Sequence, residues 1–336
     1  YLRVLPELNA SVRQAVRECD AYILRMPGLL GRLALREINR LGRPCALEVV
    51  GDPWDALGPG TWPSLLRPFF RRAAARQLRV ACRHAMAVHY VTQQALQRRY
   101  PPGEKAYAVG FSDALMDAAF ASAEILEQRY GRIEQAARNA GDRGRRFRIG
   151  FIGSLARMYK GPDLLLHAAA DCRSRGLDFE MVMVGDGRHA QAMQALARRL
   201  GIADRTQFAG QLPYGQAVFD FLDSIDLFVM PSRAEGLPRA LLEAMARGCP
   251  CIGCEVGGIP ELLAQDDLAP LGDAQALAGK ILEVAGSPQR LKQMALRNLE
   301  KARQFSPEFL EEARRGFFRY VRDHSEARPA NPRREA

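Results

Sequence analysis

From residue 146 onward, short apolar runs alternate with amphipathic segments of helical period. The apolar runs have the length of buried strands and lie at 146–153, 179–185, 205–210, 225–231 and 249–253. The segments between them carry apolar residues three or four positions apart, as helices do, at 161–176, 188–201, 215–224 and 238–247. Strands that alternate with helices form βαβ units, so the pattern predicts a parallel sheet with helices on both faces.

The first half of the chain shows the same alternation less clearly. Strand-like runs lie at 20–26, 44–51, 85–91 and 106–110, and after the last strand helices are expected at 273–286, 288–303 and 306–322. We therefore predict an α/β protein with two doubly wound, Rossmann-like domains that face each other across a cleft. In such sheets ligands bind beyond the carboxyl ends of the strands.

Residues 122–146 are charged, polar and glycine-containing, and they predict a helical excursion followed by a linker. The expected domains are 1–145 and 146–305. A C-terminal segment, 306–336, is expected to carry a helix that returns toward the first domain and then a disordered tail.

The amino-acid composition restricts the classes of protein that fit this chain. The 336 residues are 48% hydrophobic and 26% charged, as in soluble globular proteins. No apolar run approaches the roughly 18–20 residues of a membrane span, and no signal-peptide pattern follows Tyr1. Seven scattered cysteines do not form a secreted disulfide framework, so a reducing cytosol is expected.

The chain is basic, with a formal net charge of +10. Only five of its 48 basic residues are lysine, and the arginine excess favours an anionic partner such as a nucleotide, a phosphorylated lipid, a membrane face or a nucleic acid. The codon usage of a GC-rich genome would produce the same excess. The cysteines of "CPCIGC", 249–254, offer three zinc ligands without a matching pair elsewhere, and they also fit a buried strand.

The stretch "PSRAEGLPRALLEAMARGCP", 231–250, joins a buried strand to a helix. Pro238 suits the first helical position, and the free N–H groups near Gly236 and Leu237 form an anion site with the helix dipole. Glu235 and Glu243 flank this pocket, which suits a ligand with hydroxyls at both ends and phosphates between them. In the alternative interpretation, Glu243 only joins Arg239 and Arg247 in a salt-bridged helix face.

Other strand-end loops add to this picture. "GSLARMYKG", 153–161, follows a strand and offers Lys160 as a cation for a phosphate. "VGDG", 184–187, and "VGGIPE", 256–261, follow further strands and carry glycines that open the backbone toward a ligand. Together these loops predict a single pocket at one sheet edge.

Six segments in order, "FIGSLARMYKGPDLLLHAA", "VMVGDGR", "FAGQL", "DLFVMPSRAEGLPRALLEAMARGCPCIG", "VGGIPELL" and "LGDAQALAGKI", cover about 150–282. This ordered set resembles the nucleotide-sugar domain of the family-4 retaining glycosyltransferases, which have the GT-B fold. The resemblance implies a donor domain at 146–305, an acceptor-side domain at 1–145, and transfer of a sugar from a nucleoside-diphosphate sugar with retention of configuration.

The resemblance also implies roles for the matching residues. Glu235 would contact the donor sugar, Glu243 the ribose and Lys160 the diphosphate, without a metal or other cofactor. The remaining donor-binding residues would be Gly153, Ser154, Arg157, Gly185, Phe208, Gly210, Gln211, Gly236, Leu237 and Pro238, with the base against 208–211. Glu235 and Lys160 would be catalytic.

The chain departs from the family at two places. Ser154 stands where many members have Arg, and Arg157 is the residue that would compensate. The family's first strand and glycine-rich loop have no counterpart before "YLRVLPELNASVRQ", so we expect one N-terminal βα unit to be missing from this chain. Asp52 stands near the place of a frequent His and is the candidate for a catalytic acceptor-side residue, the alternative being a turn Asp before Pro53.

The expected acceptor is a glycan or a lipid-linked glycan of bacterial surface polysaccharide synthesis, with no nucleic acid as partner. The basic, aromatic segment 64–85 predicts peripheral contact with the anionic inner face of the cytoplasmic membrane, or alternatively a solvated arginine face. A catalytically inactive transferase-like subunit stays open as an alternative. An NAD(P)-dependent oxidoreductase lacks support because no G-x-G-x-x-G follows a strand.

Overall fold

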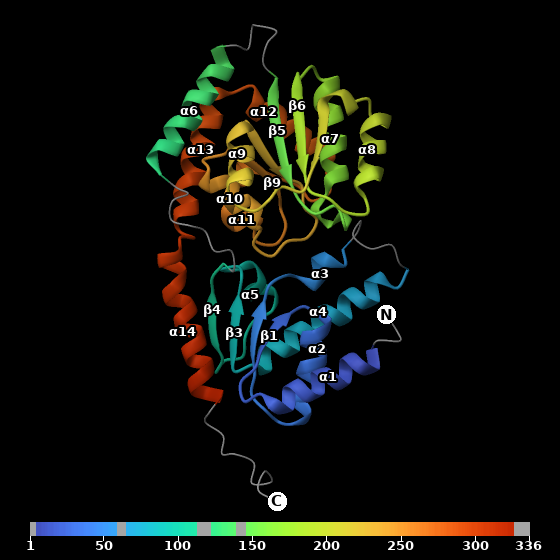
Figure 1. Ribbon diagram of the computed structural model, residues 1–336, viewed down its shortest axis with the longest axis vertical. Coiled ribbons are helices and arrows are strands. Elements are labelled where there is room, and N and C mark those ends of the chain that lie inside the picture. The colour runs from blue at the N-terminus through green and yellow to red at the C-terminus, as the bar shows by residue number, and fades with distance from the viewer. Residues whose placement is uncertain (1–4, 59–64, 113–121, 139–145, 326–336) are drawn as a thin grey trace, which may run out of the picture. The chain divides into compact units, whose positions relative to one another are not determined.

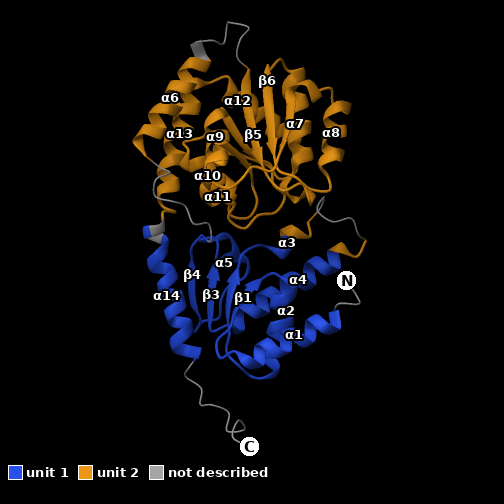
Figure 2. Cartoon of the chain, viewed as in Figure 1, with its two compact units in different colours: residues 1–54, 68–113, 308–336 blue, residues 55–67, 114–307 orange. Residues whose placement is uncertain are grey.

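The computed structural model describes residues 5–58, 65–112, 122–138 and 146–325, and the chain divides into two compact units (Figure 1, Figure 2). Unit 1 comprises residues 1–54, 68–113 and 308–336. Unit 2 comprises residues 55–67 and 114–307.

Unit 1 has a parallel sheet with the strand order β1-β2-β3-β4 among the described residues. Its strands are β1 Ile23–Met26, β2 Ala46–Val49, β3 Ala87–Tyr90 and β4 Tyr107–Gly110. Because neighbouring strands follow each other in sequence, right-handed crossovers place the connecting helices on one face. The helices are α1 Leu5–Glu18, α2 Leu29–Arg40, α4 Arg67–His84, α5 Ala95–Arg99 and α14 Pro307–Ser325, and α3 Pro53–Ala56 lies at the unit boundary.

The C-terminal helix α14 packs on the sheet of unit 1. Phe317 is fully buried, with its ring centroid 6.4 Å from that of Phe111. Tyr320 stacks on Tyr107 at 4.8 Å. These aromatic contacts explain why the last helix of the chain belongs to the unit that contains the first strands.

Unit 2 has a six-stranded parallel sheet with the order β10-β9-β8-β5-β6-β7. Its strands are β5 Phe147–Ile152, β6 Phe179–Val184, β7 Thr206–Gly210, β8 Leu227–Met230, β9 Cys251–Cys254 and β10 Leu268–Ala269. The helices are α6 Ala123–Arg138, α7 Pro162–Ser174, α8 Ala190–Arg199, α9 Gln216–Ser224, α10 Arg239–Ala246, α11 Ile259–Leu262, α12 Ala274–Ala285 and α13 Pro288–Arg303.

The strand order of unit 2 reverses between β5 and β8, which are paired neighbours. The chain proceeds from β5 to β6 and β7 on one side, and then from β8 to β9 and β10 on the other. The loops after β5 and β8 therefore lead to opposite faces of the sheet. This topological switch point is where open α/β sheets have a crevice for ligands.

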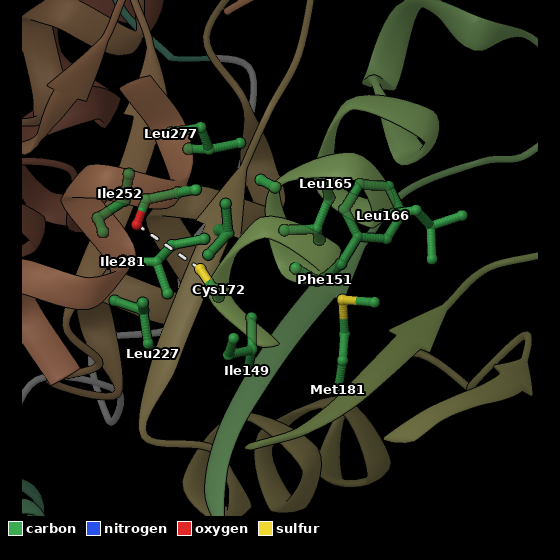
Figure 3. Close-up of a cluster of buried hydrophobic side chains, with 14 of the residues drawn as sticks. Ile149, Phe151, Leu165, Leu166, Cys172, Met181, Leu227, Ile252, Leu277 and Ile281 are labelled. Atoms are coloured by element: carbon green, nitrogen blue, oxygen red, sulfur yellow. Dashed lines mark hydrogen bonds between the residues drawn. The ribbon is translucent and has the colours of Figure 1, made fainter. Parts of the chain in front are cut away.

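The core of unit 2 lies between this sheet and its helices. Phe151, Leu165, Ile252 and Ile281 are fully buried in one cluster, part of which is shown in Figure 3. Cys172 joins the cluster, and its thiol donates a hydrogen bond to the carbonyl of Ala278 at 3.6 Å. Close packing of these apolar runs holds the strand ends, and the loops that follow them, in one arrangement.

Helix α6 packs on unit 2, although the sequence boundary at 145 places it with the first domain. Its Arg129 is only 3% exposed and donates to the carbonyls of Ile225 (2.6 Å) and Leu222 (2.9 Å). These long-range contacts explain why a charged helix belongs to the later unit. The predicted linker at 139–145 and the predicted tail at 327–336 lie outside the described residues.

Candidate functional site

The loops after β5, β6 and β7 are joined by backbone hydrogen bonds at the carboxyl edge of unit 2. The N–H of Gly153 donates to the carbonyl of Val184 (2.9 Å), and the N–H of Gly185 donates to that of Gly210 (2.7 Å). Gly185 has a φ of +138°, and a Cβ there would lie 1.9 Å from the carbonyl oxygen of Gly153. Only glycine therefore lets these two loops approach so closely.

Lys160 and Glu235 meet where the loops after β5 and β8 come together. Lys160 ends the 3₁₀ helix η3 Met158–Lys160, and its Nζ lies 2.8 Å from Oε1 and 3.0 Å from Oε2 of Glu235. Glu235 is 9% exposed, so its carboxylate requires a partner of opposite charge. An ammonium has three N–H donors, so Lys160 retains a donor for a further anionic oxygen.

Three residues that the sequence patterns do not single out hold these loops in place. Ser232 is fully buried and donates from its hydroxyl to Oε1 of Glu235 at 2.6 Å. The guanidinium of Arg233 binds both carboxylate oxygens of Asp163, at 2.7 and 2.8 Å. This bidentate pair ties the loop after β8 to the first turn of α7. The only local signal for the first of them is its spacing, since Ser232 stands three positions before Glu235.

The segment 236–238 leads from Glu235 into α10. The structure places Pro238 one position before the helix, and its carbonyl accepts from the N–H groups of Leu241 and Leu242, both at 3.2 Å. The N–H of Gly258 donates to the carbonyl of Gly236 at 2.7 Å, which ties the loop after β9 to this segment. The N-terminus of α10, the positive end of its dipole, thus follows Glu235 after the three residues 236–238.

Glu243 lies on α10 and is 8% exposed. Its Oε1 accepts from Nε of Arg239 at 2.9 Å, as the salt-bridge interpretation of the sequence predicts. Arg247 instead pairs with Asp223, so the alternative in which Glu243 joins both Arg239 and Arg247 is wrong for Arg247. Burial raises the pKa of Glu243, and the neighbouring Arg239 offsets only part of that effect.

Glu243→Gln is expected to raise the melting temperature at neutral pH. Burial raises the folded-state pKa of Glu243 above its ordinary value. The free energy of unfolding of the wild type therefore falls, relative to that of the Gln variant, as the pH rises through the raised pKa. We expect a gain of up to about 4 °C in thermal unfolding. The gain in melting temperature should shrink as the pH falls toward the ordinary glutamate pKa of 4.5.

The matched control for this change is Glu283→Gln on the exposed face of α12. It removes the same charge from an exposed position, so its melting temperature should stay within about 1 °C of wild type. A lower melting temperature for Glu243→Gln than for this control would contradict the stated effect of burial.

The predicted base-binding residues lie at the other end of the sheet edge. Phe208 and Gly210 belong to β7, and Gln211 follows directly. In the order β8-β5-β6-β7, β7 is three strands away from β8. At about 4.8 Å per strand spacing, the two groups of predicted residues are separated by about 14 Å along the edge.

Ser154 and Arg157 lie on the exposed side of the loop after β5. The hydroxyl of Ser154 accepts from the N–H of Ala156 at 3.2 Å and so supports the loop itself. For Arg157, the described part of the chain shows no hydrogen bond or ion pair to its guanidinium. Arg157 is therefore available to bind an anion, whereas the charge of Lys160 is already paired.

Asp52, the acceptor-side candidate, follows β2 in unit 1 and is 6% exposed. Its Oδ1 accepts from the N–H of Trp54 at 2.7 Å and from the hydroxyl of Tyr100, and its Oδ2 pairs with Arg99. These donors hold the carboxylate in the turn before α3. The arrangement explains its burial by a structural role, and a catalytic role for Asp52 stays a prediction.

Cys249, Cys251 and Cys254 are buried at β9, and burial raises the pKa of the Cys254 thiol to about 11. Within the described ranges, no group of three or more His, Cys, Asp or Glu side chains is placed to hold a metal ion. Nor does any helix of those ranges combine the length and apolarity that crossing a membrane requires.

Comparison with known proteins identifies similar sequences and similar folds. Residues 146–287 match the family described as Glycosyl transferases group 1. CapJ from Staphylococcus aureus is 25% identical over 289 residues, which cover 84% of this chain and 67% of CapJ. The amylovoran biosynthesis glycosyltransferase AmsK from Erwinia amylovora is 36% identical over 146 residues, which cover 40% of this chain and 35% of AmsK.

Two solved structures extend the likeness over both units. HepE from Anabaena, in complex with UDP-glucose, has a TM-score of 0.67 at 20% identity and covers 94% of this chain and 82% of its own. Sucrose-phosphate synthase from Thermosynechococcus elongatus has a TM-score of 0.73 at 15% identity, and the match covers 96% of this chain and 79% of the synthase chain. The expected fold class, two parallel-sheet α/β domains of the GT-B type, is confirmed. The domain at residues 146–287 is thus similar to the group 1 glycosyltransferases.

Proposed function

We propose that this protein is a glycosyltransferase, which moves a sugar from a nucleoside-diphosphate sugar to an acceptor hydroxyl with retention of the anomeric configuration. The observation that carries the proposal is the Lys160–Glu235 pair at the β5/β8 switch point, in the loop that leads into α10. A cation and a helix N-terminus stabilise the negative charge that a departing diphosphate acquires. UDP-glucose in the structure of HepE supports a donor of this class.

The proposed donor lies along the carboxyl edge of the sheet in unit 2. Its sugar contacts Glu235, its diphosphate contacts Lys160 and Arg157, and its base lies against 208–211. The span of about 14 Å between β8 and β7 is of the size that an extended nucleoside-diphosphate sugar needs. Since Arg157, the remaining donor of Lys160 and the N-terminus of α10 face the diphosphate in this proposal, the proposed reaction requires no metal ion.

The proposed acceptor is a lipid-linked or free glycan of a bacterial surface polysaccharide. The name of AmsK, an amylovoran biosynthesis glycosyltransferase, supports this context. We place the protein in the cytoplasm, with unit 1 in peripheral contact with the inner face of the membrane. Helix α4 supports that contact, because Phe69 and Phe70 are 68% and 41% exposed on a helix with six arginines and no acidic residue.

The test compares UDP-, GDP- and ADP-sugars with NAD. The correct donor at saturating concentration should raise the melting temperature by about 5 °C. NMR of the product should show the donor's anomeric configuration, and EDTA should not change the rate. Binding without turnover would support an inactive subunit, stabilisation by NAD alone would support an oxidoreductase, and an inverted product would overturn retention.

A further inference from the structure

Helices α2 and α4 of unit 1 flank a groove of about 830 Å³. Its buried lining includes Leu35, Cys45 and Ala81, and its exposed walls include Phe69 and Val80, which are 68% and 47% exposed. Large apolar side chains exposed beside an apolar groove are typical of a binding surface. Phe69 also belongs to the proposed membrane contact of α4, whereas the donor site uses none of these residues.

The rim of the groove is cationic. Arg36 and Arg76 line it, and none of its lining residues is acidic. Among the described residues, neither guanidinium takes part in a hydrogen bond or ion pair. Arg43, which also lines the groove, is already bound to the carbonyls of Val16 and Cys19, at 3.1 and 3.0 Å. Arg36 and Arg76 are therefore the two guanidinium groups available for an anionic ligand.

The groove reaches the amino edge of the sheet. Cys45 and Ala85 line it, and they precede β2 and β3 respectively. Asp52 follows β2 and lies at the opposite, carboxyl edge of the same parallel sheet. A ligand in the groove would thus lie away from the predicted acceptor-side residue of this unit.

We propose that this groove binds one anionic phospholipid of the membrane. The phosphate lies between Arg36 and Arg76, and an acyl chain lies along Ala73, Val80 and the buried floor. A guanidinium rim matches a phosphate, and only a ligand with an apolar chain also covers the floor. This lipid site rests on the proposed membrane contact, and it specifies the class of lipid and the residues that bind it.

The experiment measures sedimentation of the full chain with vesicles of phosphatidylcholine, with and without phosphatidylglycerol. Arg36→Gln/Arg76→Gln is compared with Arg198→Gln/Arg199→Gln, a pair on exposed positions of α8 in unit 2. Both variants remove two charges from a net +10. The groove variant should lose about 30-fold in affinity for the anionic vesicles, and the control should stay within about twofold of wild type.

Further measurements distinguish binding of a lipid in the groove from attraction by charge alone. Ala73→Trp fills the groove without removing charge and should also weaken vesicle binding. Monomeric dihexanoyl-phosphatidylglycerol should compete with vesicles, whereas glycerol 3-phosphate should not. Equal loss in the two arginine pairs, or equal competition by glycerol 3-phosphate, would overturn the lipid site.

Donor hydrolysis without vesicles separates this proposal from the transferase assignment. All variants should retain wild-type hydrolysis and melting temperature, because none of the substituted residues belongs to the donor site. If the wild type does not bind anionic vesicles at all, the membrane contact and the groove assignment both fail, while the transferase assignment stands.

Discussion

Glu235→Gln is expected to slow sugar transfer by about 10²–10³-fold while nucleotide binding is retained. Under the proposed function Glu235 faces the transferred sugar, and its carboxylate also neutralises Lys160 at 2.8 Å. Glutamine keeps the size of the side chain but removes its charge. Lys160 then interacts more strongly with the diphosphate, so the Kd for the nucleoside diphosphate should stay equal or fall. Initial rates and titration calorimetry measure the two effects.

Lys160→Met is the complementary change. It removes a charge-assisted hydrogen bond to the diphosphate and should weaken nucleotide binding by about 10- to 100-fold. It also leaves Glu235 buried without its cation, so a lower melting temperature is expected. Glu283→Gln serves as the control for both variants. Wild-type transfer by Glu235→Gln, together with wild-type nucleotide affinity of Lys160→Met, would contradict the assignment.

The order of strands and helices in unit 2 is predictable from the sequence because its strands are continuous apolar runs. All residues of β8 and β9 are buried, as in a parallel sheet covered on both faces. The glycines that follow β5 and β6 mark close approaches between loops, and Gly185 against Gly153 shows this directly. Local pattern therefore predicted which loops belong to one edge.

The partners across those loops are not predictable in the same way. Asp163 and Arg233 are separated by 70 positions, and they meet because β5 pairs with β8 as well as with β6, the next strand in sequence. Helix α6 shows the same limit, since the burial of its Arg129 depends on carbonyls almost a hundred positions later. Strand β10 has two residues, too few for any periodicity.

The Asp163–Arg233 pair is expected to position the loops after β5 and β8, which carry Lys160 and Glu235. Asp163→Asn or Arg233→Lys should lower kcat by about 10- to 100-fold, because a displacement of Lys160 against Glu235 of about 1 Å costs up to about 100-fold. Neither residue is assigned a donor contact, so the KM for the donor should change much less than kcat. Steady-state kinetics of the single variants measure both values.

Charge reversal distinguishes positioning from general destabilisation. Asp163→Arg/Arg233→Asp restores the ion pair in the opposite sense and should recover part of the kcat lost in each single reversal, which a double-mutant cycle quantifies. The matched control is Arg173→Lys, since Arg173 binds Asp204 at 2.6 Å on the exposed surface of the same unit. That control should retain wild-type kcat, because an exposed pair remote from the switch point contributes little to stability or position. If both arginine variants lose kcat equally, or if the double reversal recovers nothing, the pair does not position the loops.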